Sequence, residues 1–191
     1  VPQVDGKKIA IYGYSRDGKQ VAIAAALDER IAAVVAGSPG VGGILPFRFA
    51  GERNQAESIQ TTTMMFPDWF NPRLRFFAGR EDRLPVDGNL LLSAIAPRPF
   101  LLVDGLNDEV SNDWGDEQSI HSAQKVYDFT GGSKNLDLLR VPGFHGSNNM
   151  PVDIDWLDIQ FGRSNRTWTN HFIFPWNYQE WLKRDAPKID M

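Results

Sequence analysis

One short stretch, from Gly13 to Gly18, does most to limit what this chain can fold into. A β-branched run over residues 8–12 stops at Gly13, a single serine stands between bulky neighbours, and an alanine-rich segment follows. This pattern predicts a strand, a sharp turn and then a helix over about residues 17–27. A serine presented between a strand and a helix is typical of a nucleophile elbow.

Ser15 occupies the tip of that predicted turn. The helix behind it would direct backbone N–H groups toward an oxyanion formed beside the serine. The usual elbow pattern is Gly-x-Ser-x-Gly, whereas Asp17 here displaces the last glycine to Gly18. The motif alone is therefore also compatible with Ser15 being an ordinary turn or helix-capping serine.

The composition favours one globular domain over residues 1–191 and narrows the possible partners. Of the residues, 42% are hydrophobic and 23% are charged, so the chain can bury a core. The net charge of −4 and the scattered Lys and Arg argue against nucleic acid and anionic membranes as partners. No apolar run has the length of a membrane span.

The residue types available also argue against a metal centre. There is no cysteine, which excludes disulfides, a thiol nucleophile and thiolate metal ligands. The three histidines lack the i, i+4 spacing of a zinc site, so we predict neither a metal nor a cofactor. His121 falls in a predicted helix and His171 in an aromatic tail, where packing or placement at the surface is expected for both.

Further strands and helices alternate along the chain. Apolar segments predict strands at 31–36, 100–104 and 136–141, and helices at 90–95, 117–129 and 152–161. Residues 37–88 are broken repeatedly by glycine and proline and predict a loop-rich excursion, typical of a cap or a binding surface. A tail beyond Gly162 carries three tryptophans and is expected to pack on the body. The fold class is α/β, with a mostly parallel sheet.

Three reactive side chains follow the ends of predicted strands. Ser15 follows the first, Asp108 the third and His145 the fourth. The carboxyl ends of parallel strands meet at one edge of the sheet, and the order serine, acid, histidine is that of an α/β-hydrolase. His145 would take the serine proton while a carboxylate orients its ring. Asp108 is the preferred carboxylate, with Asp113 and then Glu109 as alternatives, and a purely structural loop histidine is the alternative for His145.

The elbow segment Gly13-Tyr14-Ser15-Arg16-Asp17-Gly18-Lys19 resembles the Gly-Cys-Ser-Arg-x-Gly-Lys signature of the glucuronoyl esterases, family 15 of the carbohydrate esterases. Similar segments extend over nearly the whole chain, among them residues 38–43, 94–99 and 142–146. The resemblance implies a secreted or periplasmic α/β-hydrolase with a three-layer sandwich. It also implies a carbohydrate ester substrate in glucuronoxylan or a lignin-carbohydrate ester, cleaved between the glucuronic acid on xylan and a lignin alcohol.

The same resemblance suggests roles for four further side chains. Arg16 would help to hold the oxyanion, and Lys19 would bind sugar hydroxyls. Gln60 is similar to a sugar-contacting glutamine, and Trp114 is similar to a sugar-stacking tryptophan. Without the resemblance, Lys19 could be a solvated helix lysine and Trp114 a packing residue at the rim.

The chain departs from the family pattern in three ways. Tyr14 replaces the cysteine of the signature. Residues 36–39 offer no carboxylate where fungal members carry the catalytic glutamate, which favours the Asp108 loop as the source of the acid. The chain also starts at the elbow, where the family has about four earlier strands. We therefore expect a C-terminal portion of the fold, lacking a loop that often donates a second oxyanion N–H. The edge of its first strand would be open for pairing.

These observations lead to one preferred hypothesis and two alternatives. The preferred hypothesis is a serine esterase that hydrolyses 4-O-methyl-glucuronoyl esters through a Ser-Asp-His triad and an acyl-enzyme. An acetylxylan esterase or another small-acyl esterase would use the same triad. A non-catalytic fragment or carbohydrate-binding remnant is the alternative from a different class. Asn165-Arg166-Thr167 fits a glycosylation sequon, relevant only in a eukaryotic secretory host.

Overall fold

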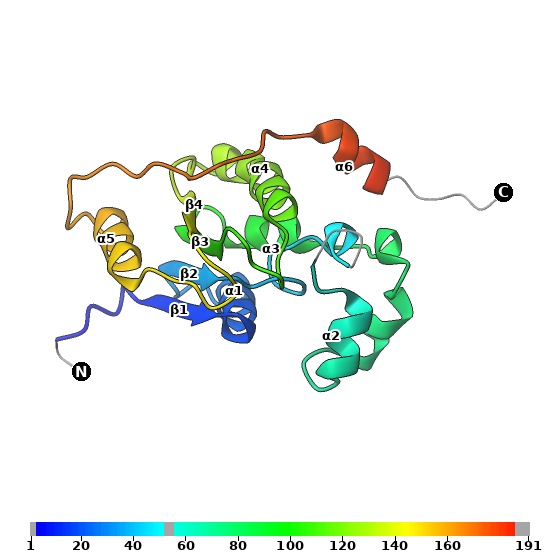
Figure 1. The fold of residues 1–191 in the computed structure, drawn as a ribbon. Coiled ribbons are helices and arrows are strands. Elements are labelled where there is room, and N and C mark those ends of the chain that lie inside the picture. The colour runs from blue at the N-terminus through cyan, green and yellow to red at the C-terminus, as the bar shows by residue number, and fades with distance from the viewer. Residues whose placement is uncertain (1–2, 52–55, 186–191) are drawn as a thin grey trace.

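A four-stranded parallel sheet forms the centre of the computed structural model, which describes residues 3–51 and 56–185 (Figure 1). The strands lie side by side in the order of the chain: β1 (Ala10–Tyr14), β2 (Ala33–Gly37), β3 (Phe100–Gly105) and β4 (Leu136–Val141). All four predicted strands are confirmed, the first two with ends shifted by one or two residues and the third ending one residue later. Since every pair is parallel, the carboxyl ends of the strands meet at one edge of the sheet.

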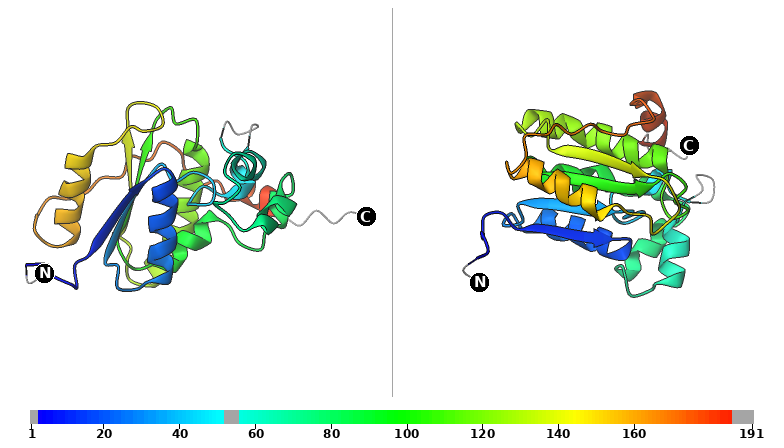
Figure 2. Two further views of the ribbon diagram at one scale, coloured as in Figure 1. Left: turned by 90° about the horizontal axis from the view of Figure 1, so that it is seen from below. Right: turned by 60° about the vertical axis from the view of Figure 1, so that its left-hand side comes forward.

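Helices cover both faces of this sheet and give three layers (Figure 2). One face carries α1 (Arg16–Leu27), α3 (Gly88–Ile95) and α4 (Asp113–Phe129), and the other carries α5 (Met150–Gln160). Alternate residues of β3 enter the two cores, since Leu102 packs toward α4 and Leu101 packs toward Trp156 of α5. Because both faces are covered, β2 and the first four residues of β3 are continuous apolar runs and not alternating ones.

The excursion between β2 and β3 is more regular than predicted. Its described part contains η1 (Phe47–Phe49), α2 (Ile59–Met65), η3 (Pro72–Phe77) and η4 (Glu81–Arg83), while residues 52–55 lie outside the described residues. The prediction missed α2, which begins at a capping box between Ser58 and Thr61. Threonine takes the place of the Glu or Gln that usually reveals such a box, so the sequence signal was weak.

The α1 and α5 helices begin one and two residues earlier than the sequence predicted, at Arg16 and Met150, and α3 and α4 also begin earlier. The α4 helix starts at Asp113 instead of Glu117, because the Asn112 side chain caps it by accepting a hydrogen bond from the Gly115 N–H at 2.6 Å. The predicted helix at 90–95 is α3, which starts at Gly88 with the Asp87 carboxylate as its cap.

The C-terminal tail lies along β4, as its aromatic content predicted. The Asn170 side chain accepts a hydrogen bond from the Leu138 N–H, and the His171 N–H donates to the Leu138 carbonyl. Trp168 packs into the core on the α5 side, and Trp181 is buried in α6 (Tyr178–Asp185). His121 contacts this tail through a 2.9 Å hydrogen bond to the Phe174 carbonyl, which confirms its packing role.

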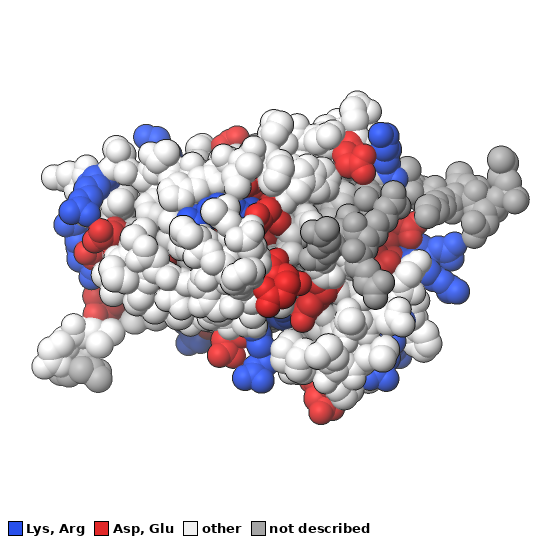
Figure 3. Space-filling view, in the orientation of Figure 1, with Lys and Arg blue, Asp and Glu red and all other residues white. Residues whose placement is uncertain are grey.

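The described surface carries mixed charge. On the face drawn in Figure 3, Lys and Arg side chains are scattered among Asp and Glu. Within residues 3–51 and 56–185, no helix combines the length and the apolar character needed to cross a membrane.

Candidate active site

The turn between β1 and α1 holds Ser15 in a left-handed conformation, with φ at 55°. Its backbone N–H donates to the Gly37 carbonyl at 2.8 Å, which ties the turn to the end of β2. A Cβ at Gly13 would lie 2.3 Å from the Asp17 carbonyl, so only glycine permits this tight reversal. A Cβ at Gly18 would lie 2.6 Å from the Gly37 carbonyl. The displaced glycine of the motif therefore allows α1 to approach β2 closely.

His145 and Asp108 complete a hydrogen-bonded row with the serine. The Nε2 atom of His145 lies 2.9 Å from the Ser15 Oγ, and its Nδ1 atom lies 3.0 Å from the nearer oxygen of Asp108. The side chain of Asp108 is fully buried, and one of its oxygens also accepts the Val110 N–H at 2.8 Å. Three residues separated by up to 130 positions in the chain thus meet at the carboxyl ends of β1, β3 and β4.

The two alternative carboxylates have other partners. Asp113 lies 2.5 Å from the guanidinium of Arg140, which also pairs with Asp104 and Glu117. Glu109 is exposed and accepts a 3.3 Å hydrogen bond from the backbone N–H of His145. Of the three carboxylates that the sequence left open, Asp108 is the one within hydrogen-bond distance of the imidazole.

The electrostatic environment favours a basic imidazole beside an ionised carboxylate. The hydrogen bond to Asp108 raises the pKa of His145, against the opposing effect of burial. Burial alone would raise the pKa of Asp108, but the hydrogen bonds from His145 and from the Val110 N–H outweigh it and lower that pKa. This is the arrangement expected of a histidine that accepts a proton from a neighbouring hydroxyl.

Lys19 and Arg16 both lie beside Trp69, on the α1 side of the serine. The Lys19 side chain is only 5% exposed, and its Nζ atom donates to the Pro39 carbonyl at 2.6 Å. The interpretation of Lys19 as a solvated helix lysine is therefore wrong. Burial lowers its pKa, against the effect of Glu57 at 3.7 Å. The Arg16 guanidinium is largely exposed and lies 5.7 Å from the centre of the Trp69 ring.

A hollow of about 180 Å³ lies between α1 and the excursion. Its lining includes Arg16, Lys19 and Trp69. Sequence reasoning gave Trp69 no place in the site, although an aromatic residue in a glycine-rich and proline-rich excursion is a usable signal.

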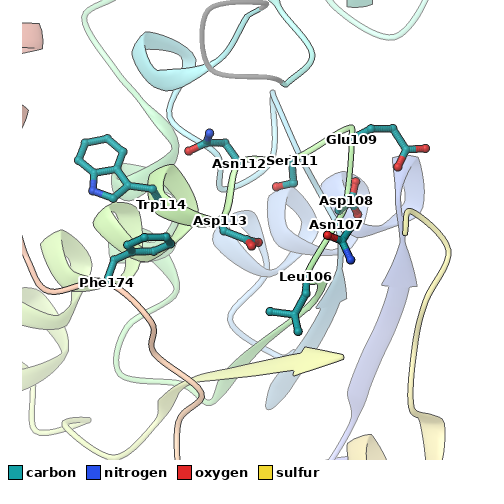
Figure 4. Close-up of a pocket in the computed structure, with 9 residues that line it drawn as sticks. All are labelled: Leu106, Asn107, Asp108, Glu109, Ser111, Asn112, Asp113, Trp114 and Phe174. Carbon is teal, nitrogen blue, oxygen red and sulfur yellow. The ribbon is translucent and has the colours of Figure 1, made fainter. Parts of the chain in front are cut away.

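A second hollow, of about 410 Å³, opens on the other side of the acid loop (Figure 4). Asp108 lies at one end of it, while Trp114 and Phe174 form an aromatic wall at the other. Trp114 is half-buried and meets Phe49 edge-on at 4.8 Å. Gln60 is exposed on the first turn of α2 and is not among the described residues that line either hollow.

Beneath the triad lies a buried polar network that sequence reasoning missed. Ser38 follows β2, is fully buried and donates a hydrogen bond to Asp104 at 2.9 Å, and Asp104 pairs with Arg140 at 2.8 Å. Burial raises the pKa of Asp104 well above its ordinary value, and the carboxylate of Asp116 acts in the same direction. Ser38 could have been noticed as the polar residue at the end of a strand, but only a carboxylate was sought there.

No group of three or more His, Cys, Asp and Glu side chains in the described parts of the chain is arranged to hold a metal ion.

Comparison with known proteins identifies the family. A sequence profile described as "Glucuronyl esterase, fungi" matches residues 1–131. The chain belongs to the glucuronoyl esterase family. It is 33% identical over 139 residues to carbohydrate esterase MZ0003, from an unknown prokaryotic organism, and this match covers 73% of the chain and 31% of the relative.

Two further members of the glucuronoyl esterase family match over nearly the whole chain. A 4-O-methyl-glucuronoyl methylesterase of Phanerochaete carnosa is 26% identical over 97% of the chain and 49% of its own length. A family 15 glucuronoyl esterase of Caldicellulosiruptor kristjansonii superposes with a TM-score of 0.80 and 31% identity, over 92% of this chain and 49% of that one. The α/β-hydrolase fold is thereby confirmed. The chain spans about half the length of each of these two glucuronoyl esterases.

Proposed function

We propose that this chain carries the catalytic residues of a serine esterase that cleaves 4-O-methyl-glucuronoyl esters. The observation that supports this most strongly is the continuous row from Ser15 Oγ through His145 to Asp108, at 2.9 and 3.0 Å. Membership of the glucuronoyl esterase family adds the substrate class, since a relative bears the name 4-O-methyl-glucuronoyl methylesterase. We further propose that residues 1–191 act as one domain and that the whole protein acts outside the cytoplasm.

In the proposed reaction, Ser15 Oγ attacks the ester carbonyl while His145 Nε2 takes its proton. The tetrahedral intermediate then expels the alcohol, which receives that proton from the imidazolium. His145 then takes a proton from water, which attacks the carbonyl of the resulting acyl-enzyme. The second tetrahedral intermediate expels Ser15 Oγ, which receives that proton from the imidazolium, and the uronic acid is released. Throughout, Asp108 keeps the Nδ1 proton of His145 in place and stabilises the imidazolium.

The oxyanion is proposed to form at the N-terminus of α1. The first N–H groups of this helix, beginning with that of Arg16, have no acceptor within the helix and point toward the elbow. Arg16 follows Ser15 directly in the chain. A change of its side-chain rotamer, away from the Trp69 ring, would bring the guanidinium to the oxyanion as a charged donor.

The sugar is proposed to bind beside Lys19. One donor of its ammonium goes to the Pro39 carbonyl, which leaves donors for sugar hydroxyls. In the second hollow, Trp114 supplies an aromatic face suited to a pyranose ring. Gln60, which lines neither hollow, is the remaining proposed sugar contact.

The direct test is turnover of a benzyl glucuronate ester beside p-nitrophenyl acetate, measured on the monodisperse chain. Cleavage of the glucuronate ester with a clear preference over the acetate is expected. A preference for the acetate would favour the alternative of a small-acyl esterase. A folded chain that cleaves neither ester would contradict the proposal and favour a non-catalytic carbohydrate-binding remnant.

The pH dependence of kcat/KM should report the titration of His145. The imidazole must be neutral to accept the serine proton, and its pKa is raised by Asp108. Activity is therefore present above that raised pKa and is lost as the pH falls through it. We expect the acid limb on a glucuronate ester, which itself does not titrate, to have its midpoint above the ordinary histidine value of 6.5. A midpoint below that value would contradict the assignment of His145 as the base.

Lys19→Ala should lower kcat/KM much more on the glucuronate ester than on p-nitrophenyl acetate. Loss of a charged hydrogen bond to a sugar hydroxyl corresponds to a loss of about tenfold or more, whereas acetate has no hydroxyl to lose. Lys125→Ala is the matched control, because its ammonium also lies over a tryptophan, Trp176, but in contact with the tail. Equal losses on both esters would rule out a sugar-binding role.

Pairing along β1 remains a prediction. This strand lies at one edge of the sheet in the described part of the chain, with the Tyr12 side chain 38% exposed. Size-exclusion chromatography over a range of concentrations would test whether that edge joins two copies.

A further inference from the structure

Tyr14, the last residue of β1, lies between the nucleophile and the loop that carries the histidine. Its hydroxyl accepts a hydrogen bond from the Gly146 N–H at 2.8 Å and lies 2.6 Å from the Ser38 Oγ. The centre of its ring is 5.6 Å from that of His145. One side chain thus connects the residue before Ser15 with the residue after His145.

The hydrogen atoms in this row can be assigned from its acceptors. The Asp104 Oδ1 atom accepts both the Ser38 hydroxyl, at 2.9 Å, and the Gly105 N–H, at 3.1 Å. Because Ser38 has given its one proton to Asp104, it accepts the proton of the Tyr14 hydroxyl. The Tyr14 oxygen is then left to accept the Gly146 N–H. Every donor has an acceptor, and the row ends on a carboxylate that Arg140 holds at 2.8 Å.

The ring of Tyr14 is held in place by the end of β2. A Cβ at Gly37 would lie 2.3 Å from the Tyr14 ring, so the absence of a side chain there makes the space that the ring occupies. The Tyr14 hydroxyl is therefore held at a fixed position, where the loop that carries His145 contacts it.

The loop that carries His145 needs such an anchor, because a glycine in the left-handed region lies on each side of the histidine. Gly143 has φ at 129° and Gly146 has φ at 100°, so the backbone around His145 turns easily. Before the histidine, the Asn107 N–H donates to the Gly143 carbonyl at 2.9 Å. After it, the Gly146 N–H donates to the Tyr14 hydroxyl at 2.8 Å.

We propose that Tyr14 is a positioning residue, whose hydroxyl holds the Gly146 end of the loop and thereby keeps the His145 Nε2 atom at hydrogen-bond distance from Ser15. This inference rests on the proposed esterase function for its catalytic effect. Tyr14 contacts neither the ester bond nor the proton that moves from Ser15 to His145. It acts only by fixing the position of the imidazole.

The test compares Tyr14→Phe with Tyr12→Phe, which removes a hydroxyl from the same strand at a position away from the loop. For Tyr14→Phe we expect kcat on benzyl glucuronate to fall by about tenfold with little change in KM, which corresponds to one lost hydrogen bond in the positioning of the base. The far-downfield proton resonance of the His145 Nδ1–H, held by Asp108, should broaden in the same variant. Tyr12→Phe should change neither quantity.

The proposal requires that both kcat and the His145 Nδ1–H resonance change in Tyr14→Phe. An unchanged kcat, an unchanged imidazole resonance, or an equal change in Tyr12→Phe would each overturn it. If the unmodified chain turns over neither ester, the proposed function fails, and the resonance alone decides whether Tyr14 positions the imidazole.

Ser38→Ala serves as a second variant if Tyr14→Phe does not fold. It keeps the ring and the Gly146 bond but removes the acceptor of the phenol proton, so a smaller loss, about threefold in kcat, is expected with a broadened resonance. If Ser38→Ala showed a wild-type kcat and a wild-type His145 Nδ1–H resonance, the proposal would be overturned.

Discussion

Ser15→Ala is expected to lower kcat on a benzyl glucuronate ester by on the order of 10⁵-fold, to the limit of detection. The substitution removes the proposed attacking atom, the Ser15 Oγ, which lies 2.9 Å from the His145 Nε2 atom. KM should change little, because the proposed sugar contacts remain. The measurement is steady-state turnover together with binding of the intact ester to the variant.

The matched control for the serine is Ser164→Ala. The Ser164 hydroxyl accepts a hydrogen bond from the Arg166 N–H in the C-terminal tail, so its loss removes a similar atom at another part of the molecule. We expect wild-type turnover from this control and a melting temperature close to wild type from both variants. Turnover by Ser15→Ala at the wild-type rate would show that the nucleophile lies elsewhere.

Asp108→Asn is expected to have the second largest effect, a loss of about 10³- to 10⁴-fold in kcat. An amide can donate to Nδ1, and this favours the imidazole tautomer that carries its proton on Nε2, where it cannot accept the serine proton. The carboxylate that raises the pKa of His145 is also lost. The acid limb of the residual activity should therefore move to lower pH, which a pH profile of the variant would measure.

Asp113→Asn separates the two candidate acids. Asp113 bonds to Arg140, which keeps Asp104 and Glu117 as partners, so kcat should stay within about threefold of wild type. If instead Asp113→Asn inactivates the chain and Asp108→Asn does not, the acid of the triad has been misassigned.

The sequence carried most of the information on where the reactive side chains lie. Ser15, Asp108 and His145 each follow an apolar run, and parallel strands bring such positions to one edge whatever the details of the loops. The choice between Asp108 and Asp113 was open, because both lie after β3 and only the direction of a loop separates them. That direction depends on Asn112, whose capping bond begins α4 at Asp113.

The polar row beneath the triad could not be predicted in the same way. Tyr14, Ser38 and Asp104 lie at the ends of three different strands, and their contact depends on side-chain rotamers and on the space beside Gly37. A buried arginine such as Arg140 has no sequence signature, since its burial depends on carboxylates supplied from β3 and α4. Patterns of polarity predict which elements form, but they do not predict which polar groups will be buried together.

The order of the strands has a consequence for how the protein is made. Each strand of the sheet is added next to the one before it in the chain, so during synthesis the sheet can grow at one edge as the chain leaves the ribosome. The serine is made first, its acid follows more than ninety residues later, and the base is made last, after β4. A nascent chain therefore holds the Ser15 hydroxyl without its proposed base, His145, until β4, the last of the described strands, has been made.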